Sequence, residues 1–174
     1  FGGSLGAAHI NEGVCRLKSE LLARKGLVVV HSTGADGFDE TVSALALTPE
    51  EQIRWRVMPY ISNMGEALAA SDLVLSRAGA SSIAEIAALA VPSLLVPYPH
   101  ATADHQTTNA RYLTDAGAAV LVPDDKIDEP VFSQELLGLL DDSSRREAMR
   151  EAARGLGQQS AAAALADQVE AAAR

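Results

Sequence analysis

The chain has 174 residues, of which 48% are hydrophobic, 21% are charged and only 4% are aromatic. This length is enough for one globular domain with a core of its own, and the abundant alanine suggests helices that pack through small side chains. The formal net charge of −9 leaves no basic stripe for phosphate backbones, which argues against a nucleic-acid partner.

Cysteine content and hydropathy point to the cytoplasm. The single cysteine, Cys15, excludes an internal disulfide and suits a reducing compartment, and its apolar helical face predicts a place in the core. No apolar run approaches the roughly 20 residues of a membrane span, and no signal peptide is recognisable. We therefore expect a cytoplasmic domain with no transmembrane segment.

Short apolar runs alternate with helical patterns along the first 125 residues. The runs that predict strands are 27–31, 53–57, 73–76, 93–97 and 118–122. Four are continuously apolar, as in parallel strands covered on both faces, whereas 53–57 alternates and is expected nearer an edge. The stretches that predict helices are one containing Ile10, Val14, Leu17 and Leu21, then 63–70, 82–90 and 106–116. Such alternation predicts an α/β fold with a doubly wound parallel sheet.

From Glu129 onward the strand pattern stops, and two or three helices are expected up to an alanine-rich end. We interpret residues 1–174 as a single domain, with a Rossmann-like core over about 1–125 and a C-terminal helical cap over 126–174. No internal repeat or long linker divides it.

Ligands of such sheets bind outside the carboxyl ends of the strands, where three loops of this chain are chemically unusual. The first loop, GGSLGAAH, contains Gly3, Ser4 and Gly6 and lacks both the G-x-G-x-x-G spacing and a Walker lysine. Its glycines could let the backbone approach a phosphate, with Ser4 and the next helix assisting, or they could form a plain tight turn. His9, just beyond it, is expected to be a helix-surface residue.

The second loop, SRAGASSIAE, follows the strand at 73–76. Ser82 and Glu85 have the spacing of a capping box that would open a helix at Ser82. The small residues at Gly79, Ala80 and Ser81 also leave bare backbone of the kind that an anion site needs. In that second interpretation Glu85 would be free to accept hydrogen bonds from a sugar diol.

The third loop, VPYPHATADHQTTNA, ends in a helix whose expected N-cap is Asp104. Gln106 and Asn109 are three residues apart and share a helix face with each other, close to His105. Side-chain amides both donate and accept, so they suit sugar hydroxyls, although a solvated helix start is the alternative.

The order and spacing of these loops are more specific than any one of them. A G-G-S-x-G-A loop, a P-Y-I segment, R-A-G-A-x-x-x-x-E and D-x-Q-x-x-N-A follow one another along residues 2 to about 122. Together they resemble the C-terminal, donor-binding domain of the MurG glycosyltransferases, which belong to glycosyltransferase family 28 and have the two-domain GT-B architecture. The resemblance implies that this chain is the Rossmann-like half of such an enzyme, beginning at the end of its first strand, with an N-terminal acceptor domain outside it.

The resemblance also implies a set of donor contacts. The donor would be UDP-N-acetylglucosamine, with Ser4 and the glycine-loop backbone at the diphosphate and the backbone of Gly79–Ser82 facing the diphosphate and sugar. Tyr60 would lie against the uracil, the Ile61 backbone would read its edge, and Glu85 would bind the ribose hydroxyls. The residues implied in substrate binding are Gly3, Ser4, Gly6, Tyr60, Ile61, Gly79, Ala80, Ser81, Ser82, Glu85, His105, Gln106 and Asn109.

Of the three residues expected at the GlcNAc hydroxyls, Gln106 and Asn109 fit the family pattern and His105 departs from it. Arg77 also fits the motif, and its role could be structural.

The implied reaction is an inverting transfer of GlcNAc to a lipid-linked acceptor, lipid I, which gives lipid II of peptidoglycan synthesis. It needs a base for the acceptor hydroxyl and stabilisation of the departing UDP. In the family the base, the acceptor site and the membrane-docking face belong to the N-terminal domain, so we assign no catalytic residue here and expect the isolated chain to be inactive. No D-x-D carboxylate pair is present, and we expect neither a metal nor another cofactor.

Two alternatives stay open at this point. A related diacylglycerol glycosyltransferase would have similar donor loops. A stand-alone UDP-sugar-binding subunit of a split transferase, as in the eukaryotic dolichol-linked GlcNAc transferase, would also fit. The sequence upstream of Phe1 would separate the split protein from the fused one. The full-length enzyme is expected to be a peripheral protein on the cytoplasmic face of the bacterial plasma membrane.

Overall fold

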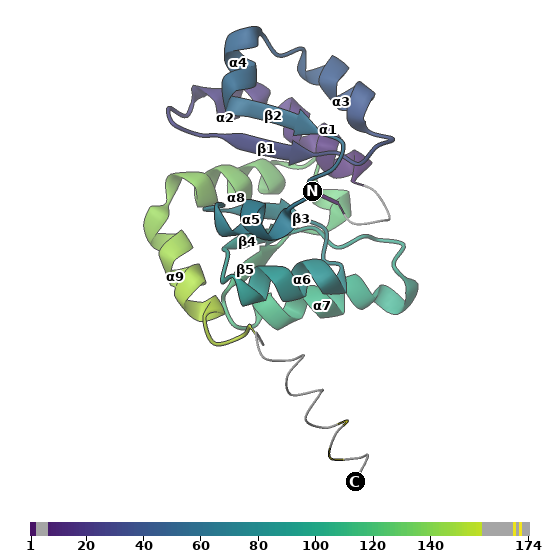
Figure 1. The fold of residues 1–174 in the computed structure, drawn as a ribbon, viewed down its shortest axis with the longest axis vertical. Coiled ribbons are helices and arrows are strands. Elements are labelled where there is room, and N and C mark those ends of the chain that lie inside the picture. The colour runs from purple at the N-terminus through teal and green to yellow at the C-terminus, as the bar shows by residue number, and fades with distance from the viewer. Residues whose placement is uncertain (3–6, 158–168, 170, 172–174) are drawn as a thin grey trace.

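The computed structural model describes residues 1–2, 7–157, 169 and 171 (Figure 1). Its helices and strands, in chain order, are α1 (Ala8–Arg16), α2 (Lys18–Ala23), β1 (Val29–Ser32), α3 (Phe38–Leu45), α4 (Pro49–Arg54), β2 (Trp55–Met58), α5 (Met64–Ala69), β3 (Val74–Ser76), α6 (Ala80–Ala88), β4 (Ser93–Leu95), α7 (His105–Thr114), β5 (Ala119–Leu121), α8 (Pro130–Asp141) and α9 (Ser143–Ala153). Two 3-10 turns, η1 (Thr102–Asp104) and η2 (Asp124–Lys126), precede α7 and follow β5.

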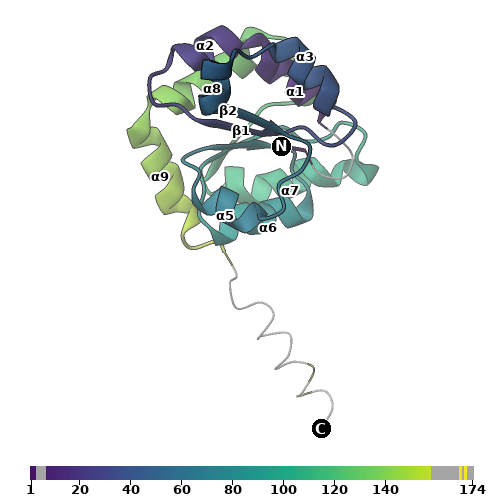
Figure 2. The same ribbon diagram turned by 45° about the horizontal axis from the view of Figure 1, so that its top comes forward.

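All strand pairs are parallel, as the sequence predicts. β1 pairs with β2 so that Val29 lies opposite Trp55, and β4 lies between β3 and β5 with Leu94 opposite Leu75 and Val120. Helices cover both faces of the strands, with α1, α2, α3 and α8 on one face and α5, α6 and α7 on the other (Figure 2). The α/β, doubly wound prediction is confirmed.

Each face of the sheet has its own core. One core contains Ile10 and Val14 of α1, Trp55 of β2 and Phe132 of α8, and the other contains Ile86 of α6 and Leu113 of α7. Adjacent residues of β4 divide between the two cores, Leu94 in the first and Leu95 in the second, because successive side chains of a strand point to opposite faces. Cys15 packs against the first core, as expected.

The helical cap is confirmed over residues 130–153. α8 lies along the first core, and α9 ends in Ala153, which is fully buried in the second core. A third helix at the alanine-rich end would fall on residues 158–174, nearly all of which lie outside the described residues.

The described strands form two ladders and not one continuous ladder, with β1–β2 separate from β3–β4–β5. Phe1 lies beside β3: its amino group donates to the Leu75 carbonyl over 2.7 Å, and its own carbonyl accepts from the Arg77 N–H over 3.2 Å. That alternation is the hydrogen-bond pattern of a residue paired in parallel with Ser76. A pocket separates the two ladders. Its lining includes residues 27–31 at the β1 edge of one ladder and residues 73–75 at the β3 edge of the other.

Several predicted boundaries were wrong. The stretch 53–57 is not all strand, since Ile53 and Arg54 end α4 and β2 begins at Trp55. Thr48 opens α4 with a full capping box: its hydroxyl accepts from the Glu51 N–H, and the Glu51 carboxylate accepts from the Thr48 N–H. The first helix is also interrupted, at Leu17, which separates α1 from α2.

Candidate functional site

The second and third loops singled out in the sequence follow β3 and β4 and lie at one edge of the sheet. The parallel register places Ser76 opposite Leu95 and Leu95 opposite Leu121, so the segments that leave β3, β4 and β5 emerge side by side. Figure 1 shows β1 and β2 running in the same direction as β3. The carboxyl ends of all five strands therefore form one rim.

The N-terminus of α6 lies on this rim and differs from the prediction. The helix begins at Ala80, with Gly79 in an extended conformation as its N-cap, so Ser82 is the third helical residue and is buried. The capping box between Ser82 and Glu85 was wrong, and no side chain caps this helix. Ala80 and Ser81 are exposed, which leaves the first backbone N–H groups available to an anion.

Glu85 lies about one and a half turns into α6 and is exposed. Its carboxylate has no hydrogen-bond or ion-pair partner among the described residues. Helical side chains tilt toward the N-terminus of their helix, so this carboxylate leans toward the open end of α6. It can therefore accept hydrogen bonds from a group bound there.

The amides of α7 hold the chain that leads into α6. The Oε1 atom of the buried Gln106 accepts from the Ala78 N–H over 3.1 Å and from the Tyr98 N–H over 3.0 Å, and Asn109 Nδ2 donates to the Ala78 carbonyl over 3.1 Å. These two side chains thus hold both backbone groups of Ala78, the residue just before the α6 cap. Their contact with a sugar stays a prediction, as does that of the exposed His105.

Replacing Gln106 tests this role. Gln106→Leu should lower the free energy of unfolding by about 1–3 kcal/mol, because two N–H groups lose their acceptor. Gln106→Glu should cost much less, since a carboxylate accepts both bonds and is favoured in the first turn of α7. Urea unfolding of both variants measures the difference, and equal losses would show that the acceptor atom is unimportant.

Asp104 stands at the N-cap position of α7, as expected, with a positive φ of 52°. Its carboxylate accepts from the Thr107 hydroxyl over 2.6 Å and from no backbone N–H of the helix.

The remaining sequence candidates lie elsewhere on the rim or outside the described chain. Tyr60 and Ile61 follow the end of β2, and the Tyr60 side chain is 76% exposed, so its ring is free to stack on a ligand. The glycine-loop residues Gly3, Ser4 and Gly6 lie outside the described residues. The helix that follows them, α1, has Ala7 as its N-cap and no acidic residue in its first turn.

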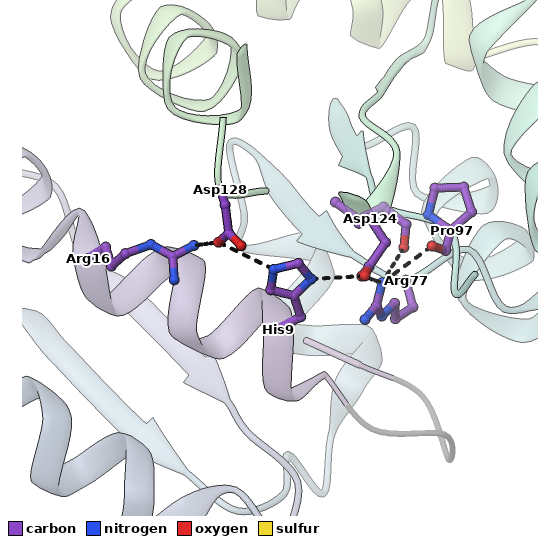
Figure 3. A network of polar contacts seen from close by, with 7 residues as sticks. His9, Arg16, Arg77, Pro97, Asp124 and Asp128 are labelled. Atoms are coloured by element: carbon purple, nitrogen blue, oxygen red, sulfur yellow. Dashed lines mark hydrogen bonds and ion pairs between the residues drawn. The ribbon is translucent and has the colours of Figure 1, made fainter. Parts of the chain in front are cut away.

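A polar network that the sequence did not predict joins these loops (Figure 3). Asp124, in η2, accepts from Arg77 Nη1 and from His9 Nδ1, the latter over 2.8 Å. Asp128 contacts His9 Nε2 over 3.3 Å and pairs with Arg16. His9 is therefore not a plain surface residue, because its ring connects α1 to two carboxylates.

Arg77 is the buried member of this network, and its contacts in the described structure are with other residues of the chain. It is 5% exposed, and Nη1 also donates to the carbonyls of Val96 and Pro97, each over 3.3 Å. Its guanidinium lies over the Tyr98 ring, 5.5 Å from the centroid. The cation is thus neutralised by Asp124 and joins the ends of β3, β4 and β5.

The charges of the network support one another. The hydrogen bond to Asp124 raises the pKa of His9 above its usual value, although partial burial opposes this. Burial raises the pKa of Asp124, but the hydrogen bonds from His9 and Arg77 outweigh it, and the net pKa is lowered. The imidazolium and the carboxylate therefore each favour the charged form of the other.

Comparison with known proteins identifies the family. The model of the glycosyltransferase family 28 C-terminal domain matches residues 1–169. The chain belongs to this family. The family 28 resemblance expected from the loop motifs is therefore confirmed, and the match extends over the helical cap.

Two curated relatives of this family 28 domain carry the same name. The chain is 45% identical over 169 residues to the UDP-N-acetylglucosamine--N-acetylmuramyl-(pentapeptide) pyrophosphoryl-undecaprenol N-acetylglucosamine transferase of Chlorobium phaeobacteroides. It is 44% identical over 172 residues to the protein of that name from Methylococcus capsulatus. These matches cover 97% and 95% of the chain but 45% and 46% of the relatives, so the chain spans about half their length.

One solved structure agrees with the family 28 assignment, and a second shares the fold. The crystal structure of Acinetobacter baumannii MurG superposes with a TM-score of 0.81 at 31% identity, over 98% of this chain and 48% of that one. A glycosyltransferase of kitacinnamycin, at a TM-score of 0.61 and 19% identity, covers 90% of this chain and 38% of its own, and shares the fold.

Within the described residues, no helix is long and apolar enough to cross a bilayer. Nor does that part of the chain group three or more side chains that could hold a metal ion.

Proposed function

We propose that this chain is the donor-binding domain of an inverting glycosyltransferase. The full-length protein would transfer GlcNAc from UDP-GlcNAc to lipid I, undecaprenyl-pyrophosphoryl-MurNAc-pentapeptide, and so form lipid II. The observation that carries the proposal is the open N-terminus of α6 with the unpartnered Glu85 beside it. It occurs in a family 28 domain whose relatives are named for this transfer.

The rim offers complementary groups for each part of the donor. The exposed Tyr60 ring can stack on uracil, and Glu85 can accept from both ribose hydroxyls. The N–H groups of α6 can bind the diphosphate, whose negative charge grows as UDP departs. Neither the backbone φ of −63° at Gly79 nor crowding around it requires a glycine for the fold. A glycine at this position instead fits a ligand that approaches the backbone closely.

In this proposal the domain stabilises the leaving group, and the helix N-termini do so without a metal ion. The base that activates the acceptor hydroxyl would come from the half of the relatives that this chain does not span. The full-length enzyme would act at the cytoplasmic face of the bacterial plasma membrane, where its lipid-linked acceptor is anchored.

The activity is tested with the full-length protein. Incubation with radiolabelled UDP-GlcNAc and a lipid I analogue should transfer label to the analogue, with chelator present or absent. Diacylglycerol offered as the acceptor should stay unlabelled. Label on diacylglycerol alone would contradict the proposed acceptor, and dependence on a divalent cation would contradict the proposed stabilisation of UDP.

Glu85→Gln tests the ribose contact in the 174-residue chain. The ionised carboxylate accepts two hydroxyl hydrogen bonds, whereas the amide turns a donor toward one of them. UDP affinity should fall by roughly 1.5–3 kcal/mol, while the melting temperature of the unliganded domain stays nearly fixed because Glu85 has no intramolecular partner. Calorimetry and thermal unfolding measure the two quantities.

The matched ligand control is 2′,3′-dideoxy-UDP, which lacks the diol. It should bind the wild type and Glu85→Gln about equally. An unchanged UDP affinity in the variant would remove Glu85 from the site.

A further inference from the structure

One carboxylate connects the two helix starts of the rim. Asp124 Oδ2 accepts a hydrogen bond from Nδ1 of His9, which is the second residue of α1. Asp124 Oδ1 accepts from Arg77, which stands two residues before Gly79, the N-cap of α6. Figure 3 shows Asp124 between the two side chains, with η2 carrying it in from the end of β5. The segments joined in this way are 68 positions apart in the chain, from 9 to 77.

Two members of the chain of contacts His9–Asp124–Arg77 are held firmly in place, namely Arg77 and Asp124. Arg77 is held by the carbonyls of Val96 and Pro97 as well as by Asp124, and it is 5% exposed. The Asp124 side chain is 14% exposed. Movement of α1 relative to α6 would therefore break the His9–Asp124 hydrogen bond or pull a partly buried carboxylate away from a buried guanidinium.

A carboxylate at this place has a charge opposite to what a phosphate site needs. His9 and Arg77 together offset that charge, and both are already engaged by Asp124 rather than directed at a ligand. The network is thus suited to setting geometry, and the backbone N–H groups of the helix starts are left to bind the anion.

We propose that Asp124 is a positioning residue of the donor site. It binds His9 at the start of α1 and Arg77 just before α6, and so holds the two helix starts at a fixed place relative to each other. Both helix starts can then act on one diphosphate. This inference rests on the proposed function, because it takes a nucleoside diphosphate as the ligand. It predicts that the network matters for a ligand with two phosphates and matters little for one with a single phosphate.

Asp128 provides a matched control. It is also an aspartate that contacts His9, at Nε2 over 3.3 Å, but it is 65% exposed and has no contact with Arg77 among those in the described chain. Its removal takes away a similar charge near the same histidine without cutting the link between the two helix starts.

The experiment measures the affinities of UDP and UMP for the 174-residue chain by calorimetry or ligand-observed NMR. Asp124→Asn and His9→Ala should each lower UDP affinity about tenfold and UMP affinity by less than about twofold, so the preference for UDP falls. Asp128→Asn should keep both affinities within about twofold of the wild type. His9→Ala leaves the Arg77–Asp124 pair intact, so this variant alone tests the positioning role if Asp124→Asn does not fold.

The outcomes separate this inference from the proposed function. A wild-type chain that binds UDP, with the same UDP preference in both network variants, would overturn the positioning role alone. Equal losses for UDP and UMP would overturn it as well, because they would indicate a general structural effect. A wild-type chain that binds neither nucleotide would overturn the proposed function, and this inference with it.

Discussion

Replacing Asp124 by leucine is expected to lower the free energy of unfolding by about 3–5 kcal/mol, the usual cost of breaking a buried ion pair from one side. The substitution leaves the Arg77 guanidinium, which is 5% exposed, without a carboxylate. The carbonyls of Val96 and Pro97 remain as its acceptors, but neither carries a compensating charge. Urea unfolding at pH 7 measures the loss.

The reverse substitution should cost less. Arg77→Met leaves Asp124 with His9 as a charged partner and with more access to water, since the carboxylate is 14% exposed. The double variant Arg77→Met/Asp124→Leu should recover much of the stability lost in Asp124→Leu, because it removes both charges together. A single Asp124→Leu that is no less stable than Arg77→Met would contradict the buried guanidinium as the source of the cost.

Acidification should destabilise the domain through His31. This buried side chain on β1 is bonded to Asn11 Oδ1 through Nε2 over 3.0 Å, and its Nδ1 has no partner in the described structure. Burial lowers the pKa of His31 to about 4, from an ordinary 6.5. As the pH falls, His31 of the unfolded chain becomes protonated near pH 6.5, whereas His31 of the folded chain becomes protonated only near pH 4. The stability present above pH 6.5 is therefore lost as the pH falls, by roughly 3 kcal/mol across that range.

Urea unfolding between pH 4.5 and 6 measures this slope, because burial lowers the pKa of the Phe1 amino group from 8.0 to about 6 and that group adds a slope of the same sign above pH 6. His31→Gln should flatten it, while His100→Gln, which changes an exposed histidine, should keep it. His9 does not contribute to this slope. Its pKa is raised in the folded chain, so its contribution to stability is fully present below pH 6.5 and is lost only as the pH rises through the pKa of the folded state. A slope that survives in His31→Gln would show that another group titrates.

Local sequence patterns predicted the sheet and most of the helices because their signals lie within a few residues. Continuous apolar runs located β3, β4 and β5, and helical periodicity located α5, α6 and α7. The same reasoning failed at 53–57, where alternation of Ile53, Trp55 and Val57 suggested one strand. A capping box at Thr48 opens α4, and that helix continues through Ile53 to Arg54 before β2 begins.

The sequence motifs named residues of the loops that follow β3 and β4, but they did not predict the contacts between these loops. The motifs named Gly79, Glu85 and Gln106, but Gln106 binds the backbone of Ala78, 28 positions away, and nothing local in the sequence indicates that bond. Asp124 was missed for the same reason, since its partners are 47 and 115 positions away. An aspartate two residues beyond a predicted strand, in VPDD, is a local signal that could have marked it, because strand ends meet at the rim.

The central claim, that the rim is a uridine-nucleotide site, is tested most directly by comparing UDP with ADP. Calorimetry on the 174-residue chain should give weak but specific UDP binding, with a dissociation constant in the high micromolar to millimolar range, about −4 to −6 kcal/mol. ADP carries the same diphosphate and ribose, so any preference reports on the base contacts expected at Tyr60 and Ile61. Clearly weaker binding of ADP is the predicted result, and equal affinities for UDP and ADP would contradict the account.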